Sequence, residues 1–268
     1  MVIDKKIGVH IAMFCVALFY AANYSIAKWA MPEFISPFAF ITVRVGCGAL
    51  FFGLYYFLID REKIQDKRDY LDFAVCAFFG VALNMLAFFK GLSMTSAINA
   101  SVLMLLSPIM VVIYTAIGTK SKIKSGVIAG ILVSFVGAAL LVNVGSFSLS
   151  GDGLKGDLLI MLNASSFAFH LYYVARLLNK YKAITVTAFM FMIGFLFVLP
   201  VGYADFAAVE WSAFTGQAIF ALVFVVIFVT ILNYILNVWA VQHSTSTQVG
   251  SYIYLQPLLA TLIAVGLS

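Results

Sequence analysis

Three cations and one histidine lie inside apolar segments of this chain, where burying an ionisable side chain is unfavourable. Lys28, Arg44 and Lys90 fall in the outer halves of predicted membrane helices, and His170 lies within another. At 1.5 Å per residue, Arg44 is roughly 10 Å below the start of its helix, whereas Lys28 and Lys90 could extend to the interface. Imidazole titrates near neutral pH, so His170 is either a hydrogen-bonded structural residue or a proton relay.

Uncharged polar residues recur at helical spacing in the same segments. Gln248, Tyr252 and Gln256 follow one another at intervals of four residues beside Pro257. Such a stripe either forms hydrogen bonds between helices, at about 0.6 kcal/mol each, or lines a watery cavity. Its length favours the cavity here. The predicted solute-binding residues are Asn23, Tyr24, Lys28, Arg44, His170, Tyr173, Trp239, Gln248, Tyr252 and Gln256.

Pro108 and Pro257 are predicted to lie in the middle of two membrane helices. Each proline removes one backbone hydrogen bond, so we expect a free carbonyl near residue 104 and another near residue 253. The result is either a static kink, which membrane helices tolerate, or a bend used in gating. The two prolines are therefore the predicted gating residues.

Composition indicates that lipid is the solvent for most of these segments. Of 268 residues, 64% are hydrophobic and 10% are charged, whereas a soluble domain carries about 25% charged residues. The net charge of +5 comes from short loops and does not indicate nucleic-acid binding. About twenty apolar residues cross a bilayer as a helix. Nine such runs are predicted: 7–30, 37–58, 70–93, 96–117, 125–143, 156–178, 184–203, 216–240 and 245–266.

The loops between these helices differ in their content of lysine and arginine. With the N-terminus inside, 12 basic loop residues lie inside and one, Lys155, lies outside. Positive loops remain on the cytoplasmic side, so the sequence predicts a cytoplasmic N-terminus in an inner (plasma) membrane. The first apolar run is too long for a cleaved signal peptide and is predicted to be the first helix.

The sequence aligns with itself at a shift of 149 residues. The shift places Asn84 on Asn233 and Pro108 on Pro257 without a gap. The paired asparagines are predicted to form hydrogen bonds between helices. A repeat of this length holds five helices, and an odd number turns the second copy upside down, as in many transporters. A tenth helix would begin beyond residue 268, so either the chain is a piece of a longer protein or it lacks that helix.

Residues 20–28, YAANYSIAK, resemble the aromatic-small-x-Asn-aromatic-x-x-x-Lys motif of the EamA-type group in the drug/metabolite transporter superfamily. Arg44 matches an arginine of that family. The glutamate that often follows helix 4 there is replaced by residues 118–121, GTKS. The resemblance implies ten helices, cytoplasmic termini and a central cavity lined by both repeats. It extends through Asn84, Gly91, Ala97, Ser107, Pro108, Gly126, Gly130 and Gly137.

The sequence thus predicts an all-α polytopic membrane protein of two inverted five-helix repeats, 1–146 and 147–268, with nine spans and no tenth helix. The predicted function is secondary transport of a small organic metabolite by alternating access. No acid lies in the middle of a span and the outer halves carry cations, so a neutral, zwitterionic or anionic solute is expected. A receptor or assembly subunit without transport and a membrane enzyme are the alternatives.

The sequence contains no metal-binding, P-loop, HExxH or GxSxG motif, so no cofactor is expected and no enzyme is favoured. The expected partners are the solute and the lipid bilayer. Gly126 and Gly130 form a GxxxG pair that allows close helix contact, either within the bundle or between the protomers of a homodimer.

Overall fold

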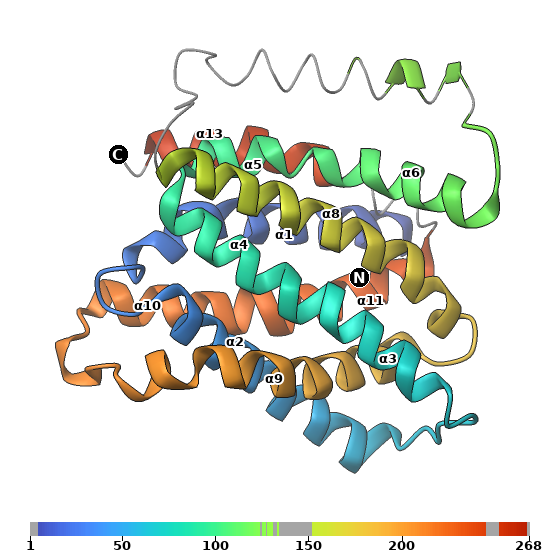
Figure 1. Cartoon of the computed structure of the whole chain (residues 1–268), viewed down its shortest axis with the longest axis horizontal. Helices are drawn as coiled ribbons and strands as arrows, with labels where there is room; N and C mark the ends of the chain where they lie inside the picture. The colour runs from blue at the N-terminus through green and yellow to red at the C-terminus, as the bar shows by residue number, and fades with distance from the viewer. Residues whose placement is uncertain are drawn as a thin grey trace.

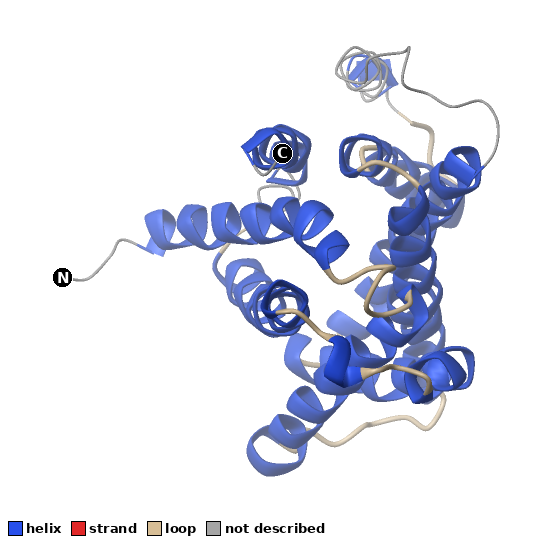
Figure 2. Cartoon of the chain, turned by 90° about the vertical axis from the view of Figure 1, so that its left-hand side faces the viewer, coloured by secondary structure: helices blue, strands red, loops and turns tan. Residues whose placement is uncertain are grey.

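The computed structural model describes residues 5–123, 125, 126, 128–130, 133, 152–244 and 252–266. Helices joined by loops make up this part of the chain, and no strand occurs in it (Figure 2). The predicted all-α fold is confirmed, whereas most of the predicted helix 125–143 lies outside the described residues. Among the described residues, seven helices are long and apolar enough to cross a membrane: Lys5–Trp29, Pro37–Asp60, Asp69–Met94, Ala97–Thr119, Gly153–Leu178, Ala183–Ala207 and Gly216–Asn237.

Most spans in the first half of the chain are divided into segments of different helical type. The third span, for example, is α-helical at both ends and π-helical in the middle. The elements are α1 (Lys5–Ile26), η1 (Ala27–Trp29), α2 (Pro37–Tyr55), η2 (Tyr56–Asp60), α3 (Asp69–Ala77), η3 (Phe78–Ala82), α4 (Leu83–Met94), α5 (Ala97–Leu103) and α6 (Leu106–Thr119).

The second half contains two long uninterrupted helices and one segmented span, followed by a shorter apolar helix over Tyr252–Gly266. Its elements are α8 (Asp152–Leu178), α9 (Ala183–Ala207), η5 (Trp211–Ala213), α10 (Gly216–Phe224), η6 (Val225–Leu232), α11 (Asn233–His243), η7 (Tyr252–Leu255) and α13 (Gln256–Gly266).

Hydroxyl side chains determine where several of these helices begin. The Ser36 hydroxyl accepts a hydrogen bond from the backbone N–H of Ala39 at 3.2 Å, and Pro37 follows as the first helical residue. Ser96 and Thr215 cap α5 and α10 in the same way. A hydroxyl at this position satisfies a backbone donor that the helix itself leaves free, which matters most where water is scarce.

Helices α2 and α9 lie side by side in the lower part of the view in Figure 1. They run antiparallel, because Phe38 at the start of α2 meets Gly202 late in α9, whereas Gly48 meets the earlier residue Phe191. A Cβ atom at Gly202 would lie 2.7 Å from the Phe38 carbonyl oxygen, and one at Gly48 would lie 2.5 Å from the Phe191 ring. Small residues let helices approach this closely in a membrane.

Several structural features recur at the 149-residue shift. The π-helical segments η3 and η6 lie at corresponding positions of the third span and the Gly216–Asn237 span. Helix α4 ends before Thr95 and α11 before Ser244, and both capping residues are extended. The packing follows the same relation. At this shift α1 corresponds to α8, α4 to α11 and α6 to α13. Accordingly, α1 contacts α11 and α13, while α8 contacts α4 and α6.

Ion pairs join two loops at one end of the bundle. The Lys180 ammonium lies 2.7 Å from an Asp69 carboxylate oxygen, and the Lys182 ammonium lies 2.5 Å from that of Asp60. The hydrogen bond from each ammonium to its carboxylate raises the pKa of Lys180 and of Lys182. The basic loop after the second span is therefore tied to the loop between α8 and α9.

Candidate functional site

Arg44 lies in the interior of the bundle, with 4% of its surface exposed. Its Nε atom donates a hydrogen bond to the Thr230 hydroxyl at 2.8 Å, which joins α2 to η6. Its Cζ atom lies 5.3 Å from the ring centroid of Phe89 in α4, a cation–π contact. In the described part of the chain, no Asp or Glu forms an ion pair with this guanidinium.

Polar side chains from two other elements surround the same guanidinium. Tyr20 of α1 and Tyr234 of α11 interact electrostatically with it, and Tyr20 also lies close to Asn233 without the geometry of a hydrogen bond. Asn233 is fully buried, and neither its amide oxygen nor its amide nitrogen has a hydrogen-bond partner among the described residues. An unpaired buried amide of this kind is unfavourable by about 1–3 kcal/mol, so its presence needs an explanation. We call Tyr20, Arg44, Thr230, Asn233 and Tyr234 the Arg44 cluster.

The predicted site residues of the first span follow Tyr20 toward the C-terminal end of that span. Asn23 is 2% exposed, and its amide oxygen has no hydrogen-bond partner in the described ranges. Tyr24 is buried with its ring edge-on to Phe88 at 5.5 Å. The Lys28 ammonium donates to the backbone carbonyl of Thr95 at 2.5 Å. Lys28 is therefore held at the turn between α4 and α5.

Two predicted residues of α8 lie elsewhere. His170 packs against η3, where a Cβ atom at Gly80 would lie 2.6 Å from its ring, and its Nδ1 atom has no partner in the described chain. The Tyr173 hydroxyl donates to Asp72 at 2.7 Å, and Arg176 lies over the Tyr173 ring at 4.6 Å. Tyr173 thus belongs to a polar contact between α8 and α3.

In the described ranges, the predicted solute-binding residues near the end of the chain belong to elements that pack against α1. Trp239 lies against the beginning of this helix, where a Cβ atom at Gly8 would come within 3.0 Å of its ring. The Tyr252 hydroxyl is 2.5 Å from Nδ1 of His10. Gln256 is buried at the start of α13, which packs against α1 and α5. Gln248 lies outside the described residues.

Both predicted gating prolines follow an interruption of the α-helix. The fourth span breaks at 104–105, so that Pro108 lies in the first turn of α6, and Pro257 is the second residue of α13 after the 3₁₀ turn η7. The expectation of a free carbonyl near residue 104 is wrong, because the Met104 carbonyl accepts a hydrogen bond from the Ser107 N–H at 3.0 Å. A tighter turn satisfies the group that proline would leave unpaired.

The repeat-related asparagines behave differently. The Asn163 side-chain amide donates to the backbone carbonyl of Asn84 at 2.8 Å, and the Asn84 side-chain amide donates to the backbone carbonyl of Asn163 at 3.4 Å. These two bonds confirm the interhelical hydrogen bonding predicted for Asn84. Asn233 has no such partner. The sequence did contain a signal, because the 149-residue shift places Phe14 where Asn163 would be needed. The repeat comparison therefore identifies Asn233 as the asparagine without a structural partner.

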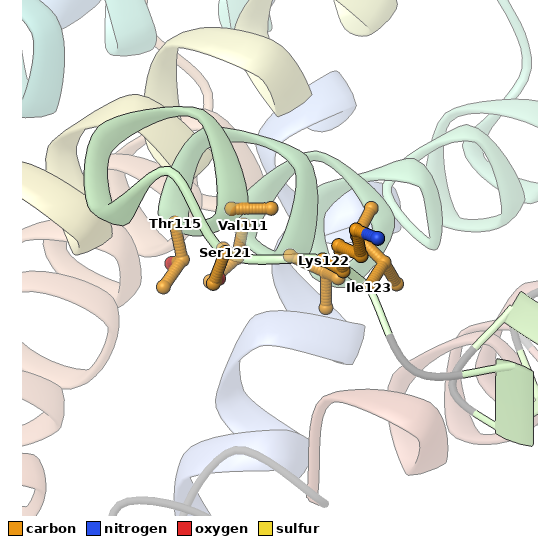
Figure 3. Close-up of a pocket in the computed structure, with 7 residues that line it drawn as sticks. Val111, Thr115, Ser121, Lys122 and Ile123 are labelled. Carbon is orange, nitrogen blue, oxygen red and sulfur yellow. The ribbon is translucent and has the colours of Figure 1, made fainter.

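A surface pocket of about 280 Å³ lies at the end of α6 (Figure 3). None of the predicted site residues lines it, so it does not coincide with the Arg44 cluster. Its walls are Val111, Val112, Thr115, Ala116, Ser121, Lys122 and Ile123.

Comparison with known proteins shows similarity along the whole chain. The model of the EamA-like transporter family matches residues 7–143 and 154–268. A protein of Archaeoglobus fulgidus named an uncharacterized transporter is 26% identical over 95% of this chain and 87% of its own length. The uncharacterized transporter YyaM of Bacillus subtilis is 22% identical over 97% of this chain and 86% of its own. A WAT1-related protein of Arabidopsis thaliana is 22% identical over 98% of this chain and 79% of its own.

A solved structure described as "Crystal structure of protein" has the same fold, with a TM-score of 0.67 and 18% identity. The alignment covers 97% of this chain and 90% of the other.

Proposed function

Because the family model spans nearly its whole length, the chain belongs to the EamA-like transporter family, and we propose that it moves a small organic metabolite across the inner membrane by alternating access. The observation that carries this proposal is the buried Arg44, which no carboxylate neutralises within the described chain. A cation kept in the membrane interior without an acidic partner marks a functional site, because a purely structural pair would include the acid. The solute is neutral, zwitterionic or anionic, since Arg44 would repel a cation.

Two inverted repeats, 1–146 and 147–268, form the basis of the alternating-access mechanism. Support comes from the paired features at the 149-residue shift and from the antiparallel packing of α2 on α9, which are corresponding helices of the two repeats. Two copies of one shape in opposite orientations can exchange conformations, which opens the site to each side of the membrane in turn.

Flux through purified protein tests this function directly. Proteoliposomes are incubated with a labelled pool of amino acids and small organic acids, and in parallel with an ethidium-like dye. We expect uptake of pool members above that of protein-free liposomes and no uptake of the dye. Binding without flux would identify a receptor or assembly subunit instead. Dye transport that persists in Arg44→Gln would refute the proposed substrate class.

The orientation of the chain has a separate test. We expect a cysteine introduced by Gln65→Cys to react with a membrane-impermeant maleimide only from the cytoplasmic side, and one from Ala208→Cys only from outside. Both residues are exposed, and the loop that holds Gln65 is rich in lysine and arginine. The native cysteines, Cys15, Cys47 and Cys76, are first replaced by alanine. The reverse labelling pattern would exclude both the orientation and the inverted repeat.

The paired helix breaks supply a prediction about gating. We expect Pro108→Ala combined with Pro257→Ala to lower the rate of uptake several-fold while leaving solute binding unchanged, because continuous helices resist the bend that opens the site. Pro200→Ala is the matched control, since Pro200 lies inside α9 and the 149-residue shift places it on Phe51. Equal uptake rates for the double variant and the control would show that the breaks are static.

A further inference from the structure

The Arg44 side chain is only partly satisfied by its protein neighbours. Its guanidinium carries five N–H donors, and in the described chain it makes one hydrogen bond, from Nε to the Thr230 hydroxyl. That hydroxyl in turn donates to the Val225 carbonyl at 2.9 Å, so Thr230 is fixed by its own helix. The planar end of the guanidinium, which binds a carboxylate through two parallel hydrogen bonds, has no protein acceptor among the described residues.

Asn233 supplies a second unsatisfied group within one turn of Thr230. Its side chain is fully buried, and both amide atoms are without partners in the described ranges. Tyr20 lies close enough to both Asn233 and Arg44 to interact with them, although its hydroxyl and the Asn233 amide do not have the geometry of a hydrogen bond. Polar side chains from α1, α2 and α11 therefore lie near one another, although α11 is far from α1 and α2 in the sequence. Unsatisfied donors that converge in a low-dielectric interior are typical of a binding site.

The other repeat shows that packing alone does not require these polar groups. The 149-residue shift places Arg44 on Ile193 and Thr230 on Val81. At that position Val81 packs against Gly194, where a Cβ atom would lie 2.6 Å from the valine side chain. The same helix contact is thus made with apolar residues in one half and with a buried charge in the other. Since an apolar contact is often as stable as a buried charge or more so, the charge requires another reason.

We infer that Tyr20, Arg44, Asn233 and Tyr234 form an anion subsite, which binds the carboxylate of the transported solute. This inference rests on the proposed transport function. The guanidinium would bind both carboxylate oxygens, while the Asn233 amide and a tyrosine hydroxyl would donate to the remaining lone pairs. The carboxylate would neutralise the buried cation, which lowers the free energy of both charges in the interior.

The charge balance favours a carboxylate over a phosphate dianion. Arg44 offers one positive charge, and the other two cations of the outer half are engaged elsewhere. Lys28 donates to the Thr95 carbonyl, and the Lys90 ammonium lies 5.9 Å from the ring centroid of Phe38. A dianion would bring a second, uncompensated charge into the same interior, which is strongly unfavourable.

Matched ligand pairs test the subsite in the purified full chain. Each amino acid of a panel is compared with its carboxamide, which has nearly the same shape but no carboxylate, and thermal stability is measured against ligand concentration. We expect at least one acid to stabilise the protein with an apparent affinity at least tenfold higher than that of its amide. Arg44→Gln should abolish this difference. Lys90→Gln is the matched control and should preserve it.

Asn233→Asp separates binding from a structural role. The new carboxylate would occupy the place of the ligand beside Arg44, so we expect the unliganded variant to melt at the same temperature as the wild type or higher. The response to the acid should fall at least tenfold. If Asn233 were only structural, the variant would keep the wild-type response.

Two results would overturn the subsite. One is a preference for acid over amide that survives both Arg44→Gln and Asn233→Asp. The other is solute uptake by proteoliposomes of the same preparation with no preference for the acid over its amide. The second result would leave the transport function intact, whereas absence of flux for every compound would contradict the transport function itself.

Discussion

Gly91→Val is expected to leave little folded protein, because the backbones of α4 and α8 touch at this point. A Cβ atom at Gly91 would lie 2.8 Å from the Gly156 carbonyl oxygen, and one at Gly156 would lie 2.9 Å from the Gly91 carbonyl oxygen. The obstacle in each case is backbone, so a side chain fits only if the helices separate. Overpacking of a tight contact typically lowers the free energy of unfolding by about 1–3 kcal/mol, and we expect about 3 kcal/mol for Gly91→Ala and more for valine.

The yield of monodisperse protein in size-exclusion chromatography and the melting temperature measure this effect. Gly266→Ala is the matched control, because no described atom lies within 4 Å of a Cβ atom at that position. We expect the control to behave like the wild type. A Gly91→Val protein with normal yield and melting temperature would mean that α4 and α8 do not cross this closely.

Thr95→Val is expected to destabilise the end of the bundle where α4 is followed by α5. The Thr95 hydroxyl donates to Asp157 at 2.5 Å, and the Thr95 carbonyl accepts from Lys28 at the same distance. Thr95 and Asp157 are both buried. Valine has nearly the shape of threonine, so the main change is a buried acid that loses a hydrogen-bond donor. We expect the free energy of unfolding to fall by about 1–3 kcal/mol.

Thr95→Ser keeps the hydroxyl and is the control for this substitution. The melting temperature of the serine variant should lie close to that of the wild type, and that of the valine variant clearly below it. Equal melting temperatures for the two variants would show that the contact between Thr95 and Asp157 does not contribute to stability. A valine variant with normal stability but slower uptake would instead indicate a role for this contact in transport.

Local properties of the sequence were sufficient to predict the seven long apolar helices found among the described residues. The predicted span 37–58, for example, corresponds to the observed Pro37–Asp60, and 216–240 to the span that begins at Gly216. Length and hydropathy decide whether a segment can cross a bilayer, and both are read from consecutive residues. The interhelical role of Asn84 was also predicted from sequence, because a polar side chain in lipid must find a partner.

The neighbours of each polar residue were decided only by the tertiary structure. Periodicity predicts that Tyr252 and Gln256 share a helix face, and the fold packs the elements that hold them, η7 and α13, against α1, where His10 meets Tyr252. Tyr173 is predicted to bind solute, and only the fold shows that its hydroxyl also donates to Asp72. Helical spacing determines which residues share a face, whereas the direction of that face depends on the packing of distant helices.

The Arg44 cluster also combines a feature that the sequence predicts with contacts that only the tertiary structure decides. The sequence alone indicates that Arg44 lies roughly 10 Å below the start of its helix, because depth follows from the number of residues. It could not indicate that Thr230 would satisfy one donor and that Asn233 would remain unpaired. The hydrogen bond between Arg44 and Thr230 joins residues 186 positions apart, and it exists only because α2 packs against η6 after the chain has folded.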